Sequence, residues 1–76
     1  MIVLETRVFT RRIEGLLDLE EYREFQLELV ARPTAGSLIQ GTGGLRKIRW
    51  AGFSRGKRGG IRVIYYYHSP TQRILL

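Results

Sequence analysis

Seven cationic side chains occur within one stretch of the chain, Gly41–Tyr67, which contains no acidic residue. They are Arg46, Lys47, Arg49, Arg55, Lys57, Arg58 and Arg62. Arginine binds phosphate through paired hydrogen bonds, and lysine binds it as a compact charge. The stretch therefore predicts contact with a polyanion or an acidic protein, and we favour a nucleic acid.

The same residue types could cleave RNA without a metal ion. Such cleavage needs a base for the 2′-hydroxyl, cations that stabilise the phosphorane and an acid for the 5′-oxygen. Lys47 is the candidate base, because neighbouring cations favour the neutral amine of a lysine. Arg49 and Arg62 are candidates to hold the phosphate, and Tyr66 to stack on a base or orient the 2′-hydroxyl. The basic half has no carboxylate, and the chain has one histidine and no cysteine, so we expect neither a metal site nor a cofactor.

The other cations of the stretch have two interpretations. Arg55, Lys57 and Arg58 lie in the glycine-rich segment Gly52–Gly60, which is either a plain hairpin loop or a grip on ribosomal RNA. We also count Arg46 among the RNA or ribosome contacts. For the three candidate catalytic cations, the alternative is an ordinary solvated face of a sheet.

Charge is separated along the whole chain. Residues 1–40 hold five arginines and all seven acidic residues, whereas residues 41–76 hold eight cations and no acid. A solvated globular surface usually mixes the two signs. The segregation therefore indicates that the second half faces an anionic partner.

Two strand-like runs, Leu45–Trp50 and Ile61–Tyr67, are bounded by glycines, which predicts a β-hairpin. Because side chains alternate between the faces of a strand, one face should be core and the other should carry the cations. The predicted core set is Ile48, Trp50, Val63, Tyr65 and Tyr67. The predicted opposite set is Lys47, Arg49, Arg62 and Tyr66.

Two helices are predicted before the hairpin. Thr6 can cap the first, Arg7–Leu17, and Asp18 with Glu21 forms a capping box for the second, Leu19–Ala31. The apolar spacing predicts one buried face on each helix. The predicted buried residues are Phe9, Ile13, Leu16 and Leu17 in the first helix, and Leu19, Tyr22, Phe25, Leu29 and Val30 in the second.

The remaining segments complete a single small domain over residues 1–76. Met1–Glu5 is expected to be a short buried strand. Pro33–Gly44 is expected to be a connector that Leu38 and Ile39 anchor in the core. The predicted fold is thus α+β, with two N-terminal helices packed on one face of a small antiparallel sheet.

The last strand-like run, Arg73–Leu76, begins a strand that the sequence leaves incomplete. Its apolar end, Ile74–Leu76, is expected to form an exposed sheet edge that self-associates. The N-terminus is charged too early for a signal peptide, and no apolar run approaches the roughly 18 residues of a membrane span. We therefore expect a cytoplasmic protein with no membrane partner.

The sequence LIQGTGGLRKIRW followed by GKRGGIRVIYYY, together with the earlier DLEEYREFQLEL, resembles the HigB branch of the RelE-like toxins of bacterial type II toxin–antitoxin systems. The resemblance implies a RelE/ParE-like fold and a small endoribonuclease that cuts mRNA on the ribosome. By position, Lys47, Arg49 and Arg62 match the basic residues of the family's active surface. The family usually continues beyond RILL with a complete strand and often a helix.

Three hypotheses follow. The first is a ribosome-dependent mRNA endoribonuclease that a cognate antitoxin protein inhibits. The second is an inactive or truncated toxin domain that only binds antitoxin or RNA. The third is a generic RNA-binding domain, which the lack of an exposed aromatic triad on the sheet disfavours.

Overall fold

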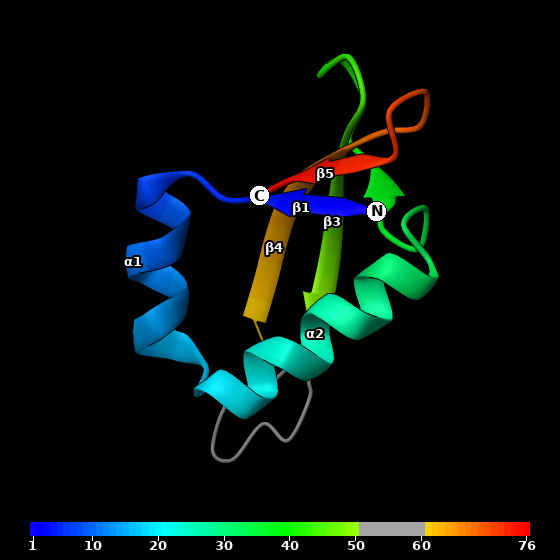
Figure 1. The fold of residues 1–76 in the computed structure, drawn as a ribbon. Coiled ribbons are helices and arrows are strands. Elements are labelled where there is room, and N and C mark those ends of the chain that lie inside the picture. The colour runs from blue at the N-terminus through cyan, green and yellow to red at the C-terminus, as the bar shows by residue number, and fades with distance from the viewer. Residues whose placement is uncertain (51–60) are drawn as a thin grey trace.

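The computed structural model describes residues 1–50 and 61–76 (Figure 1). These residues form two helices and five strands, so the fold class is α+β as predicted. The elements are β1 Ile2–Leu4, α1 Arg7–Leu16, α2 Leu19–Ala31, β2 Ser37–Leu38, β3 Leu45–Trp50, β4 Ile61–His68 and β5 Arg73–Leu75. The predicted loop Gly52–Gly60 lies outside the described residues.

The strands form one mixed sheet in the order β1-β5-β4-β3-β2. β1 runs parallel to β5, and the other neighbouring pairs are antiparallel. The prediction of a purely antiparallel sheet is therefore wrong. Alternation within a strand predicts which side chains share a face. It does not predict whether a strand from the distant N-terminal end, here β1, pairs in a parallel or an antiparallel direction.

β5 is an inner strand of this sheet, with β4 on one side and β1 on the other (Figure 1). Ile74 is fully buried and Leu76 is only 8% exposed. The predicted apolar edge at Ile74–Leu76 is therefore wrong, because β1 covers it. The N–H of Leu76 donates to the carbonyl of Leu4 at 2.8 Å, and the N–H of Thr6 donates to the carbonyl of Leu76 at 3.2 Å.

Both helices begin at the predicted caps. The hydroxyl of Thr6 accepts a hydrogen bond from the N–H of Phe9 at 3.1 Å. Asp18 and Glu21 form the complete capping box, each side chain accepting from the backbone N–H of the other at 2.8 and 3.2 Å. Such caps satisfy N–H groups that have no partner within the helix. The bounds of α2 match the prediction, and α1 ends one residue earlier than predicted.

The helices pack on the same face of the sheet, with α1 beside β4 and α2 across the lower ends of β3 and β4 (Figure 1). The core consists of buried residues from both helices and from β4 and β5, with Leu76. They are Ile13, Leu17, Phe25, Leu29, Ile61, Val63, Tyr65, Ile74 and Leu76. Ile48, Trp50 and Tyr67, which were predicted to be core, are partly buried against this cluster.

Some apolar residues predicted to be buried are exposed. Leu19 is 73% exposed, Leu16 is 44% exposed and Val30 is 36% exposed. Of the two predicted anchors of the connector, Leu38 is 62% exposed in the outer strand β2, whereas Ile39 is partly buried. Leu16, Leu19 and Val30 have the spacing of a buried helix face, but these side chains remain exposed because no other part of the described fold covers them.

A chain of aromatic rings connects the helices to the sheet. Phe9 of α1 lies 6.1 Å from Tyr22 of α2, measured between ring centroids. Tyr22 is stacked on Phe25 at 6.3 Å, and Phe25 meets Trp50 of β3 edge-on at 5.7 Å. Rings in these arrangements attract one another beyond simple burial. They fix the positions of α1 and α2 relative to β3.

Tyr65 and Arg46, directly opposite each other on β4 and β3, hold the connector between α2 and β2. Tyr65 is 1% exposed. Its hydroxyl accepts from the N–H of Gly36 at 2.9 Å and donates to the carbonyl of Pro33 at 2.7 Å. Arg46 donates to the carbonyls of Gly36 at 2.8 Å and Thr34 at 3.2 Å. The connector is therefore fixed by hydrogen bonds to the sheet.

Glu5, just after β1, joins both helices. Its carboxylate accepts hydrogen bonds from the hydroxyl of Thr10 at 2.6 Å and from the hydroxyl of Tyr22. Burial of the Tyr22 ring, and then the hydrogen bond and charge of Glu5, raise the pKa of the Tyr22 hydroxyl well above its ordinary value. The folded state therefore favours the protonated tyrosine.

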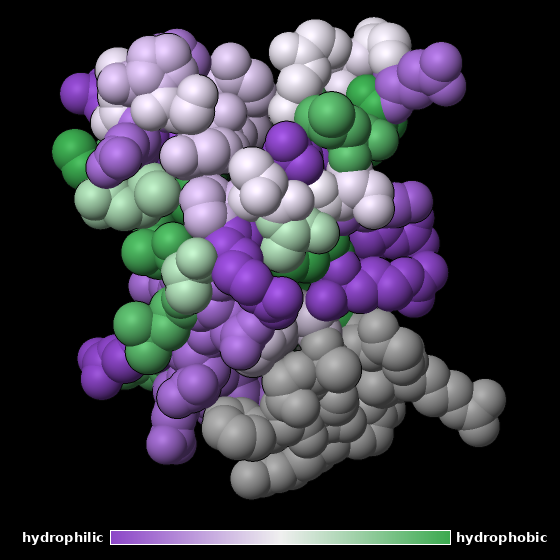
Figure 2. Space-filling model, turned by 90° about the vertical axis from the view of Figure 1, so that its right-hand side faces the viewer, coloured by the Kyte–Doolittle hydropathy of each residue, from purple (hydrophilic) through white to green (hydrophobic). Residues whose placement is uncertain are grey.

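Hydrophilic residues cover much of the side of the molecule that lies on the right of Figure 1, as Figure 2 shows. On the coloured residues of this side, hydrophobic groups are small and separate (Figure 2). Neither helix in the described part of the chain has the length and apolar character needed to cross a membrane.

We predict opposite effects for two glycine-to-alanine substitutions. A Cβ at Gly36 would lie 2.8 Å from the Tyr65 ring and hydroxyl, so Gly36→Ala should lower the free energy of unfolding by about 1–3 kcal/mol. A Cβ at Gly15 in α1 meets nothing within 4 Å, so Gly15→Ala should stabilise by about 0.5–1 kcal/mol. Urea unfolding of both variants checks this, and a Gly36→Ala variant as stable as wild type would contradict the packing.

We predict that Tyr22→Phe destabilises the protein by about 1 kcal/mol near neutral pH, because the hydrogen bond to Glu5 is lost. The pKa of Tyr22 is raised by folding, so its contribution is complete below the pKa of an unfolded tyrosine, about 10, and declines as the pH rises above that value. The stability difference between wild type and Tyr22→Phe should therefore shrink above about pH 10. Thermal unfolding across this range measures it, and an unchanged difference would show that the bond does not control the titration.

Candidate nucleic-acid interface

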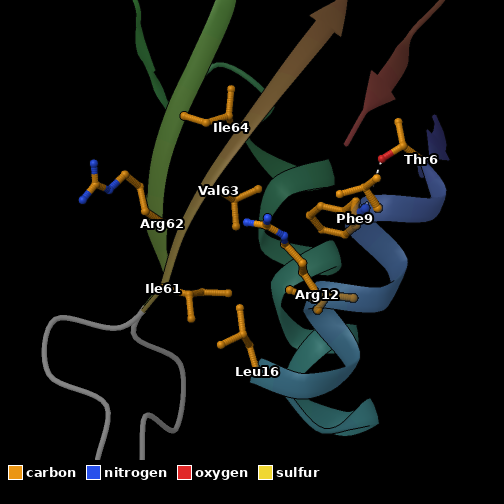
Figure 3. A pocket seen from close by; sticks show the side chains of 10 residues that line it. Thr6, Phe9, Arg12, Leu16, Ile61, Arg62, Val63 and Ile64 are labelled. Carbon is orange, nitrogen blue, oxygen red and sulfur yellow. Dashed lines mark hydrogen bonds between the residues drawn. The ribbon is translucent and has the colours of Figure 1, made fainter.

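Lys47, Arg49 and Arg62 lie on the face of the sheet that is turned away from the helices, which we call the open face. Arg49 is directly opposite Arg62, and Lys47 is opposite Ile64. All three cationic residues are exposed. In Figure 3, Arg62 points away from α1, whereas Ile61 and Val63 point toward it. The predicted grouping of the cations on one face is confirmed.

Residue pairs across two antiparallel strands are either hydrogen-bonded or non-hydrogen-bonded, and the Cα atoms lie closer together in the second kind. Arg49 and Arg62 are a pair of the second kind. The N–H of Ile39 donates to the carbonyl of Leu45 at 2.8 Å, so the odd-numbered residues of β3 direct their backbone groups toward β2. The hydrogen-bonded pairs between β3 and β4 are then the even-numbered residues of β3 with their partners. Arg49 and Arg62 are consequently a non-hydrogen-bonded pair, in which the Cα atoms approach to about 4.5 Å.

Two like charges in this position repel each other and destabilise the sheet by a modest amount. The ion pair found within residues 1–50 and 61–76 joins Arg32 to Glu28 on α2 and does not involve the open face. An anion bound between the two guanidinium groups would remove the repulsion. Lys47, two residues before Arg49 on β3, adds a third charge about 7 Å along the strand.

A row of apolar side chains borders the cations on the open face. The register aligns Leu4 of β1, Leu75 of β5, Tyr66 of β4 and Leu45 of β3 across the sheet. Leu4 and Leu75 are each 42% exposed, as is Ile64, the next open-face residue of β4. The open face thus has a cationic part at one end of β3 and β4, and beside it a mainly apolar row that crosses β3, β4, β5 and β1.

Tyr66 is half-buried and lies on the open face as predicted. A Cβ at Gly44 would come within 2.9 Å of the Tyr66 ring, and Gly44 has a φ of +125°, so a glycine is required for this approach. The centroid of the Tyr66 ring lies 6.1 Å from that of His68. Two neighbouring rings on the open face give a surface on which a base can stack.

His68 and Arg73 are open-face residues that sequence reasoning missed. They are directly opposite each other on β4 and β5, and Nδ1 of His68 lies 2.7 Å from the hydroxyl of Thr71. Continued alternation beyond Tyr66 could have placed His68 on this face. The pairing with Arg73 could not have been found, because it depends on the register of β5.

Arg46 does not share the open face with the other cations. Its guanidinium group is occupied by the carbonyls of Thr34 and Gly36, on the helix side of the sheet. The geometry therefore assigns Arg46 to the connector and not to the cationic surface. Arg55, Lys57 and Arg58 lie outside the described residues, and their contact with RNA stays a prediction.

The described side chains of the open face suit phosphate better than a metal ion. Across residues 1–50 and 61–76, no three His, Cys, Asp or Glu side chains come close enough together to hold a metal. Arginine pairs, in contrast, offer the donors that phosphate oxygens accept. No model of a known protein family matches the chain.

We predict that single-stranded RNA binds through the open face. Replacing Lys47, Arg49 and Arg62 together by glutamine should weaken binding and reduce the slope of log affinity against log salt by about 2, since each lost phosphate contact removes about 0.7. The matched control replaces Arg7, Arg11 and Arg23, three exposed arginines of the helices, which changes the net charge equally. Fluorescence anisotropy over a salt series measures both, and equal losses in the two triple variants would show that binding follows net charge alone.

Proposed function

We propose that the chain is a HigB/RelE-like toxin that cleaves mRNA on the ribosome without a metal ion. The observation that carries the proposal is the direct opposition of Arg49 and Arg62, with Lys47 beside them, on one solvent-facing side of the sheet. The sequence blocks that resemble the toxin family include these three residues. The described architecture, two helices on a five-stranded mixed sheet, is of the α+β class that a RelE/ParE-like assignment requires.

In the proposed mechanism, Arg49 and Arg62 hold the non-bridging oxygens of the scissile phosphate. Lys47 removes the proton of the 2′-hydroxyl, and the 2′-oxygen attacks phosphorus. The bond from phosphorus to the 5′-oxygen breaks, and water at this exposed face protonates the leaving oxygen. The products are a 2′,3′-cyclic phosphate and a 5′-hydroxyl. The arginines also stabilise the additional negative charge of the phosphorane.

Tyr66 has a supporting role in the proposal. It lies four residues beyond Arg62 on the same face of β4, about 13 Å along the strand. This distance exceeds the reach of one nucleotide, so Tyr66 is better placed to stack on a neighbouring base than to orient the reacting 2′-hydroxyl. In the proposed setting the protein works in the cytoplasm, with the ribosome and mRNA as its substrate complex and an antitoxin protein as its inhibitor.

A binding domain without catalysis is the second candidate. The hollow that includes Arg62 lies beside α1, whereas the hollow that includes Arg49 lies beside α2. Neither of these hollows encloses all three cations. An open cationic surface binds RNA or an acidic protein without excluding water from a reacting phosphate.

A cleavage assay in a reconstituted translation reaction separates the two candidates. We predict that primer extension detects cuts in mRNA only when ribosomes are present. Lys47→Ala and Arg62→Ala should each reduce cleavage at least about 100-fold, because a base or a phosphate contact is lost. Arg11→Ala, on the solvent side of α1, is the matched control and should cleave as wild type does. RNA binding without cleavage by the wild-type chain would overturn the toxin proposal and favour the binding domain.

A further inference from the structure

A second group of aromatic and cationic side chains lies on the open face, at the end of β4 remote from Arg49 and Arg62. It consists of Tyr66 and His68 of β4 and Arg73 of β5, and we call it the distal cluster. Arg62 is the second residue of β4 and His68 is the last, so the strand between them is about 20 Å long (Figure 1). The distal cluster is therefore separate from the three cations of the proposed cleavage site.

The fold holds the two rings of the distal cluster in place. Their centroids are 6.1 Å apart, and the ring planes are inclined by 34°. Nδ1 of His68 lies 2.7 Å from the hydroxyl of Thr71 in the turn that follows β4, and this hydrogen bond orients the histidine ring. Gly44 leaves room for the Tyr66 ring, and both rings are half-buried. Rings that are already ordered lose little conformational freedom when a ligand binds to them.

Arg73 supplies the positive charge of the distal cluster. It is exposed and lies directly opposite His68. The backbone groups of Gln72 and Leu76 bond to β1, so those of Arg73 turn to β4, and the Cα atoms of Arg73 and His68 are about 5.5 Å apart. The guanidinium group can therefore reach the phosphate of a nucleotide whose base lies on the two rings. The five described strands contain no acidic residue that would compete for it.

Along β4, the open face is apolar between the two cationic ends. Ile64 is the open-face residue between Arg62 and Tyr66, and it is 42% exposed. Leu75, directly opposite Tyr66, is equally exposed. A strand of RNA that follows β4 thus meets arginine at either end, and apolar and aromatic side chains between them. Phosphates can be held at the ends while bases contact the middle.

We propose that the distal cluster is a second contact for single-stranded RNA, which holds a nucleotide several positions away from the scissile phosphate. One base stacks on the rings of Tyr66 and His68, and a phosphate beside it binds Arg73. The inference rests on the proposed function for the identity of the ligand, and it adds that the RNA runs along β4. RNA that spans about 20 Å engages both ends of the strand, whereas shorter RNA engages one.

An acidic protein segment is a poorer ligand for the distal cluster. Carboxylates bind Arg73 as phosphates do, but they make no use of the two rings. Nucleic-acid bases have flat faces that stack on tyrosine and histidine. The combination of two ordered rings with one arginine therefore favours RNA.

The first test compares a uridine trinucleotide with a uridine octanucleotide, using fluorescence anisotropy and the full chain. The two phosphates of the trinucleotide are adjacent, so they cannot bind both ends of β4. We expect Arg73→Gln to weaken the octanucleotide about fivefold and the trinucleotide less than about twofold, because only the longer RNA reaches the distal cluster. Arg7→Gln, which removes an exposed arginine of α1 and the same charge, is the matched control.

Two substitutions at His68 test the stacking. His68→Phe keeps an aromatic ring and His68→Gln does not, while both remove the imidazole nitrogen that bonds to Thr71. We expect His68→Phe to bind the octanucleotide within about twofold of wild type, and His68→Gln to bind it at least about fivefold more weakly. An octaglutamate peptide, which has a comparable charge but no bases, should bind the two variants equally. Thermal unfolding of each variant establishes that it is folded.

The inference is overturned if Arg73→Gln and Arg7→Gln weaken the octanucleotide equally, because binding then follows net charge. It is also overturned if Arg73→Gln weakens the trinucleotide as much as the octanucleotide, or if His68→Gln binds RNA as tightly as His68→Phe. Octaglutamate that binds more tightly than the octanucleotide and depends on Arg73 would assign the distal cluster to an acidic protein instead.

These measurements need no ribosome, so their outcome is independent of cleavage. The expected losses of binding together with uncut mRNA in the translation reaction would refute the cleavage and leave the distal contact in place. Ribosome-dependent cleavage together with unchanged octanucleotide binding by Arg73→Gln would refute the distal contact alone.

Discussion

The buried hydroxyl of Tyr65 is the constraint on which the rest of the structure depends. It is held between the carbonyl of Pro33 and the N–H of Gly36, so the ring can occupy only the helix side of the sheet. Because side chains alternate, a β4 strand with Tyr65 inside must present Arg62 outside. A shift of one residue would bury Arg62 and leave the tyrosine hydroxyl without its partners, which costs far more than the Arg49–Arg62 repulsion. The cationic surface is therefore a consequence of the burial of Tyr65 in the core.

Much of this could be predicted from the sequence, because the information is local. The capping box of Asp18 and Glu21 is a pattern of neighbouring residues, and the bounds of α2 follow from it. The alternation of β3 and β4 is equally local, and it separates Lys47 from Ile48 and Arg62 from Val63 without knowledge of any partner. These two kinds of pattern were sufficient to place the candidate site on one face.

The remainder depends on contacts between distant segments. Nothing near Ile74 indicates that β1 will pair with β5 in parallel, and for that reason an inner strand was mistaken for an exposed edge. Leu19 is spaced like the buried residues of α2, but no neighbouring element covers its side chain. Arg46 belongs to a cationic cluster in sequence, yet two carbonyls of the connector hold its guanidinium group on the other side of the sheet. The periodicity of apolar residues predicts which side chains share a face of a helix or strand. Which segment covers that face depends on strand register and on contacts between distant parts of the chain.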